Sequence, residues 1–176
     1  KMTAAGLPDF GPVQNNVSFN DKAGTTRGIH AEPWDKFVSV ATGRIFGAEE
    51  ALLARAVSPE VFERAGELVN RFKRYFLDQG QPVSKNPSPG NIAGGITTLE
   101  EKSLGAVQKG GCAPLVDVID YGGTVSRPGL TLLEAPGNDA VSSTALAAAG
   151  ATLVLFTTGR GTPLGFPVPT VKVASN

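Results

Sequence analysis

The chain has 176 residues, which is enough for one ordinary domain with a hydrophobic core. Its 16 basic and 16 acidic residues balance, and this excludes a charge-driven partner such as nucleic acid or an anionic membrane surface. No apolar run approaches the ~20 residues that span a bilayer, and the first ten residues lack the apolar segment of a signal peptide. The single cysteine, Cys112, excludes an internal disulfide. We therefore expect a cytoplasmic protein with no nucleic-acid or membrane partner.

The N-terminal part reads as short strands and turns over residues 10–47. Strands are predicted over 36–40 and 44–46, on either side of a Thr-Gly turn. At Glu49 the composition changes to Ala, Leu, Glu and Arg. Because three or four short strands make only part of a sheet, we expect a small β fragment over 1–48, followed by a larger and incomplete domain over 49–176.

Two helices are predicted from their capping signals. Ser58 and Pro59 begin a helix over 59–79, with apolar residues at helical spacing and Gly80 after its end. Thr98 and Glu101 form a capping box for a helix over 99–109.

Strands and one helix alternate in the rest of the chain. Strands are predicted over 115–119, 130–133, 152–156 and 168–173, and a buried Ala/Ser-rich helix over 139–149. A strand, a helix and a strand at this spacing form a βαβ unit with a right-handed crossover. The predicted fold class is therefore α/β, with a parallel sheet.

Two polar loops follow strands of that βαβ unit, over residues 134–139 and 157–162. Ligands of open parallel sheets bind beyond the carboxyl ends of the strands, and loops from one unit should lie near each other. Their amides, hydroxyls, carboxylates and one arginine suit a polyhydroxy acid, with Arg160 pairing a carboxylate.

Structural interpretations of the same residues stay open. Asn138 or Asp139 can serve as a helix N-cap, and Glu100 and Glu101 favour the first turn of a helix. Cys112 has no histidine nearby that would activate it, so we expect a small buried residue there.

Long motifs carry a resemblance to the altronate/galactarate dehydratases. They are NPSPGNIAGGITTLEEKSLG (86–105), EKSLGAVQKGG (101–111), LLEAPGNDAVSSTALAAAGA (132–151) and LVLFTTGRGTPLG (153–165). Residues 53–176 resemble the C-terminal catalytic region of that family, whose members remove water from hexonate or hexarate sugar acids to give a 2-keto-3-deoxy acid.

The resemblance implies a divalent metal, usually Fe²⁺, and a small-molecule sugar acid as partner. It leaves the metal ligands unassigned, because the complete enzymes are much longer and this chain has one histidine. The catalytic candidates that it implies are Glu100, Lys102 and Asp139. The substrate-binding candidates are Asn86, Asn91, Thr97, Thr98, Asn138, Ser142, Thr157, Thr158 and Arg160.

A second resemblance covers residues 13–48, with the sequence VQNNVSFNDKAGTTRGIHAEPWDKFVSVATGRIFGA. This segment resembles dTDP-4-dehydrorhamnose 3,5-epimerase, a cupin-like jelly roll, and so implies a partial jelly roll. Arg27 would bind substrate, His30 would be the base and Lys36 would stabilise the enolate. The family's Tyr acid and the Asp that orients its His fall beyond residue 48, where the resemblance ends, so we expect this part to be inactive.

The sequence therefore predicts a sugar-acid dehydratase-like chain. This chain alone would be inactive if catalysis needs residues from the rest of the longer family enzymes. A non-catalytic carbohydrate-binding or structural remnant and an epimerase fragment are the alternatives. The oligomeric state stays open.

Overall fold

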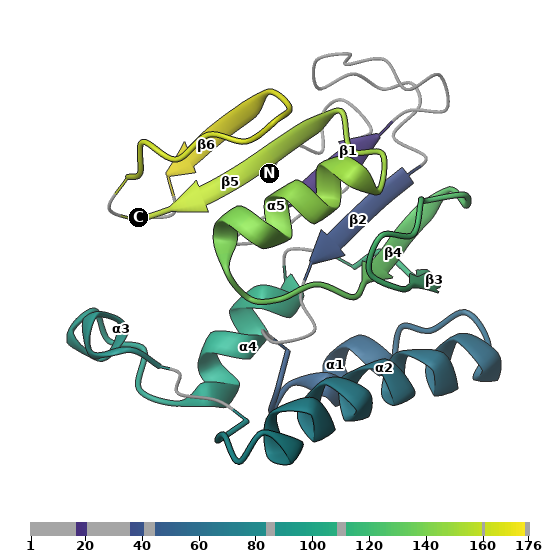
Figure 1. Cartoon of the computed structure of the whole chain (residues 1–176), viewed down its shortest axis with the longest axis horizontal. Coiled ribbons are helices and arrows are strands. Elements are labelled where there is room, and N and C mark those ends of the chain that lie inside the picture. The colour runs from purple at the N-terminus through teal and green to yellow at the C-terminus, as the bar shows by residue number, and fades with distance from the viewer. Residues whose placement is uncertain are drawn as a thin grey trace.

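The computed structural model describes residues 17–20, 36–40, 45–83, 87–108, 112–159 and 161–174, with the backbone alone for the first two segments. The elements in chain order are β1 (Val17–Asn20), β2 (Lys36–Val40), α1 (Glu49–Leu53), α2 (Pro59–Asp78), α3 (Pro89–Ala93), α4 (Leu99–Val107), β3 (Leu115–Ile119), β4 (Gly129–Leu133), α5 (Asp139–Ala148), β5 (Leu153–Thr158) and β6 (Thr170–Ala174). The described strands form one sheet in the order β3-β4-β2-β1-β5-β6 (Figure 1).

The sheet is parallel except at β1. β4 pairs in parallel with β2 and β3, and β5 with β6, whereas β1 is antiparallel to both β2 and β5. β4 and β5 therefore run in the same direction, as predicted, with α5 in the connection between them. They are not neighbours, because β2 and β1 lie between them. The α/β class is confirmed.

The strands of the predicted N-terminal β fragment lie in the middle of this sheet. Val17 of β1 pairs with Ser39 of β2 on one side and with Leu155 of β5 on the other. The two parts of the chain thus contribute strands to one sheet. The domain boundary after residue 48 and the partial jelly roll stay predictions.

Several predicted bounds need correction. Residues 45 and 46 are not a strand: Ile45 and Phe46 are buried before α1, and Gly47 turns the chain with a φ of +90°. β6 begins at Thr170 rather than at residue 168, since Pro169 has no N–H to donate to a sheet. α4 ends at Val107, and the short helices α1 and α3 were not predicted.

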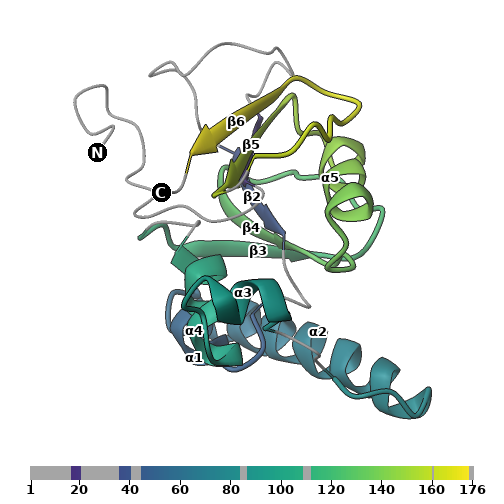
Figure 2. The same cartoon turned by 90° about the vertical axis from the view of Figure 1, so that its left-hand side faces the viewer.

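Helix α2 packs its apolar stripe on β3. The Ser58 hydroxyl accepts a hydrogen bond from the Val61 N–H at 3.3 Å, and Gly80 follows the helix with a φ of +63°. Both predicted end signals are therefore confirmed. The stripe consists of the buried residues Val61, Ala65, Leu68 and Val69. Figure 2 shows α1, α2 and α4 gathered beside the β3 edge of the sheet.

Helix α5 lies over one face of the sheet, across β2 and β5 (Figures 1 and 2). Its buried side is made of small residues and one leucine, namely Ser142, Ser143, Ala145 and Leu146. Small side chains let a helix axis approach a sheet closely, which agrees with the prediction of a buried Ala/Ser helix. Its opposite side is exposed, with Val141 39% accessible. In the part of the chain that the structure describes, no helix has the length and apolarity to cross a membrane.

Candidate functional site

The carboxyl ends of β4 and β5 lie on the same edge of the sheet. Leu132 aligns with Leu155 through the pairings of the two strands between them. Glu134 and Thr157 are therefore level, but three strand spacings of ~4.8 Å separate their backbones by about 14 Å. Loops 134–139 and 157–162 are therefore farther apart than they would be if β4 and β5 were neighbouring strands, as the βαβ prediction implied. A ligand shared by both loops would have to be reached by side chains.

Asn138 in the first loop is the N-cap of α5. Its side-chain Oδ1 accepts hydrogen bonds from the N–H groups of Ala140 at 3.0 Å and Val141 at 3.3 Å. Of the two caps left open by the sequence, Asn138 is the one used. Ser142 is 1% exposed and its hydroxyl donates to the Asp139 carbonyl at 3.3 Å. These hydrogen bonds attach the end of loop 134–139 to the first turn of α5, while Asn138 stays exposed.

In the second loop, which follows β5, threonine hydroxyls accept hydrogen bonds from backbone N–H groups a few residues later. Thr158 Oγ1 accepts from the Gly161 N–H at 3.0 Å, and Thr162 Oγ1 accepts from the Leu164 N–H at 3.2 Å. Thr157 is buried at the end of β5. Arg160 lies outside the described residues, as do Asn86, Arg27 and His30, and of Lys36 only the backbone is described.

The Pro/Gly segment brings Asn91 and Lys102 together. Asn91 Oδ1 accepts from Lys102 Nζ at 2.7 Å and from the Ser88 hydroxyl at 2.9 Å. This contact joins α3 to α4 and fixes the lysine head.

The predicted capping box begins α4. Thr98 Oγ1 accepts from the Glu101 N–H at 3.1 Å, and the Glu101 carboxylate accepts from the Thr97 N–H at 3.0 Å. Glu100 is exposed, and its Cγ lies 3.0 Å from where a Cβ on Gly47 would stand. The first-turn interpretation of both glutamates is therefore confirmed, and a second role for Glu100 stays a prediction.

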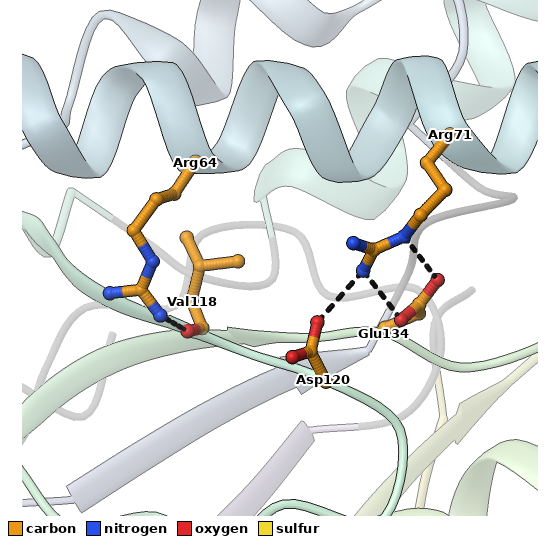
Figure 3. A network of polar contacts seen from close by, with 5 residues as sticks. All are labelled: Arg64, Arg71, Val118, Asp120 and Glu134. Atoms are coloured by element: carbon orange, nitrogen blue, oxygen red, sulfur yellow. Dashed lines mark hydrogen bonds and ion pairs between the residues drawn. The ribbon is translucent and has the colours of Figure 1, made fainter.

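Sequence reasoning missed an ion network at this sheet edge (Figure 3). Arg71 of α2 contacts Asp120, which follows β3, and Glu134, which follows β4. Hydrogen bonds to Glu134 and then to Asp120 raise the pKa of the Arg71 guanidinium. The partners are 63 and 49 residues away in sequence, so no local spacing could have shown them.

A second arginine of α2, Arg64, lies about two helical turns before Arg71 on the same side of the helix. Arg64 donates to Asp117 Oδ1 at 3.0 Å and to the Val118 carbonyl on β3. Together Arg64 and Arg71 attach the polar side of α2 to β3 and to the strand ends.

The metal ion implied by the family resemblance stays a prediction, and no ligands are assigned to it. Within the described ranges no three His, Cys, Asp or Glu side chains group as ligands. Asp120 and Glu134 are bridged by the guanidinium of Arg71. Cys112 is exposed, so its predicted burial is wrong.

Comparison with known proteins identifies the larger part of the chain. The sequence profile of a family described as D-galactarate/altronate dehydratase, C-terminal, matches residues 24–176. The chain belongs to this dehydratase family. The strand-end loops and the Pro/Gly segment all fall inside the matched region, so the candidate site is built from the residues of a dehydratase C-terminal region.

Named relatives support the assignment. The chain is 61% identical to altronate dehydratase of Bacillus subtilis over 132 residues, which are 75% of this chain and 27% of the relative. It is 39% identical to galactarate dehydratase (L-threo-forming) of Escherichia coli over 125 residues, 70% of this chain and 24% of that enzyme. The chain thus spans about a quarter of the length of the dehydratases that it matches.

A further relative belongs to another class. A protein described as RmlC homolog, from Streptococcus pyogenes, is 49% identical over 53 residues, which are 27% of this chain and 26% of that protein. This match is too short to define a second family.

Proposed function

We propose that the chain is the C-terminal region of a sugar-acid dehydratase and binds an aldonate or aldarate, such as altronate or galactarate, beyond the carboxyl edge of its parallel strands. The 61% identity to an altronate dehydratase carries this proposal. The two polar loops that leave β4 and β5 on one edge supply a place for the ligand.

The reaction is the removal of water. The C–H bond alpha to the carboxylate breaks and its proton goes to a base. The beta hydroxyl leaves with a proton as water, and the resulting enol becomes a 2-keto-3-deoxy acid. In our proposal Glu100 or Asp139 takes the alpha proton, and the Lys102 ammonium, held by Asn91, donates to the leaving hydroxyl.

Substrate binding falls to the loops. Arg160 pairs with the substrate carboxylate through its planar fork, and the polar groups of Asn138 and Thr158 face the hydroxyls. The divalent metal implied by the family resemblance stays a prediction, and we assign no step to it. We place the activity in the cytosol, in keeping with the metabolic enzymes named among its relatives.

Titration of galactarate and altronate into the chain, with NMR detection of the keto product, tests the proposal. Arg160→Lys keeps the charge but loses the fork, so binding should weaken by ~1–3 kcal/mol, the scale of a charged hydrogen bond. Equal affinities of the wild type and Arg160→Lys would show that Arg160 has a structural role in its own turn and does not bind the substrate. A wild type that binds neither acid would overturn the proposal.

The alternative to the dehydratase proposal is a carbohydrate-binding module without catalysis. Binding of both acids without product would support it. For the segment that resembles an epimerase we propose an inactive remnant. Epimerisation of a dTDP-4-keto sugar that His30→Ala abolishes would contradict this.

A further inference from the structure

The network around Arg71 connects three elements at the strand-end edge. Arg71 Nη2 donates to Asp120 Oδ1 at 2.8 Å and to Glu134 Oε2 at 2.8 Å, and Nε donates to Glu134 Oε1 at 3.3 Å. The Glu134 N–H also donates to the Ile119 carbonyl at 2.9 Å, which joins the ends of β3 and β4. In Figure 3 both carboxylates point toward α2.

The charges of this network bear on an anionic ligand. Glu134 is the first residue of loop 134–139, and its side chain is 21% exposed, whereas Asp120 is 79% exposed. A half-buried carboxylate is screened less by salt than an exposed one, so Glu134 dominates the field at the loop. Without a cation beside it, Glu134 would repel the carboxylate of a sugar acid that enters the same loop.

We propose that Arg71 is a positioning residue that turns the Glu134 carboxylate toward α2 and neutralises it, so that loop 134–139 accepts an anionic sugar acid. The inference rests on the proposed function for its ligand. The bidentate contact to Glu134 carries the inference, because a planar fork fixes both the direction of a carboxylate and its charge.

A merely structural tie makes a different prediction from a charge-neutralising one. If the tie alone mattered, losing either partner would loosen the loop, and Arg71→Gln and Glu134→Gln would harm binding alike. If the charge matters, Arg71→Gln exposes a repelling carboxylate. Glu134→Gln removes that carboxylate, and so the double variant should recover binding.

The experiment measures galactarate affinity by calorimetry for the wild type, Arg71→Gln, Glu134→Gln and the double variant. Arg74→Gln, another exposed arginine of α2, is the matched control. We expect Arg71→Gln to lower the affinity by about tenfold, as for one charged hydrogen bond. Glu134→Gln should bind at least as tightly as the wild type, the double variant should return to within about twofold of it, and added salt should shrink the Arg71→Gln defect.

Amide hydrogen exchange of loop 134–139 without ligand gives an independent readout. Faster exchange in Arg71→Gln, with no change in Arg74→Gln, is the expected result. If Glu134→Gln binds as poorly as Arg71→Gln, or the double variant is not rescued, Arg71 is only a structural tie and the inference is overturned. If the wild type binds no sugar acid, the proposed function fails, and the inference that Arg71 neutralises Glu134 for an anionic ligand fails with it. Unchanged exchange in Arg71→Gln would in addition show that Arg71 does not position loop 134–139.

Discussion

Glu49 shows how one side chain joins parts of the chain that are distant in sequence. Its Oε2 accepts from the Gly47 N–H at 2.7 Å, and its Oε1 contacts Lys73 Nζ of α2. Burial acts to raise the pKa of this carboxyl, but the hydrogen bonds from Lys73 and from the backbone outweigh it, so the pKa lies below its ordinary value of 4.5. The start of α1 is thereby fixed to the middle of α2.

That lowered pKa predicts a stability loss in acid. Since the folded state holds Glu49 ionised, the contribution is complete above about pH 4.5 and disappears as the pH falls through the lower folded value. Glu49→Gln should cost about 0.5–1 kcal/mol at pH 7 and show a smaller loss on acidification. Urea unfolding at pH 7 and pH 3 measures this, with Glu50→Gln as control. Parallel losses in wild type and Glu49→Gln would refute it.

At the scale of elements, local signals set where the helices begin. The Asn138 cap predicts that Asn138→Ala lowers the free energy of unfolding by about 1 kcal/mol. Asn138→Asp should keep the cap, since a carboxylate oxygen accepts the same N–H bonds, but should weaken sugar-acid binding by charge repulsion. Asn70→Ala is the control, because Asn70 is exposed in the middle of α2 and caps no helix. Full stability of Asn138→Ala would show that the cap contributes nothing.

The difference between local and long-range contacts explains which features could be predicted from the sequence. Ser58, Thr98 and Asn138 act within three residues of themselves, and each predicted cap is present. The order of the strands depends instead on pairings such as Val17 with Leu155, across most of the chain. Arg71 likewise finds Glu134 through the tertiary fold. Periodicity and capping carry no such information, so neither the two strands between β4 and β5 nor the ion network could be predicted from them.

At the scale of the whole molecule, β1 and β2 hold the sheet together. β2 pairs with β4, β1 pairs with β5, and the two pair with each other. Without them the remaining strands form two separate pairs, β3 with β4 and β5 with β6. Isolated two-stranded pairs are marginally stable at best. The structure thus makes β1 and β2 part of one sheet with the strands of residues 49–176.

This arrangement predicts how a truncated chain behaves. A chain of residues 49–176, the domain expected from the sequence, should lack a cooperative thermal transition, whereas residues 17–176 keep both central strands and should melt like the full chain. Circular dichroism and calorimetry of the three chains measure this. Each truncation exposes a new terminus, so their difference isolates the contribution of residues 17–48. A cooperative transition of 49–176 at the midpoint of the full chain would show that residues 49–176 fold autonomously. The central strands would then be an addition that their core does not require.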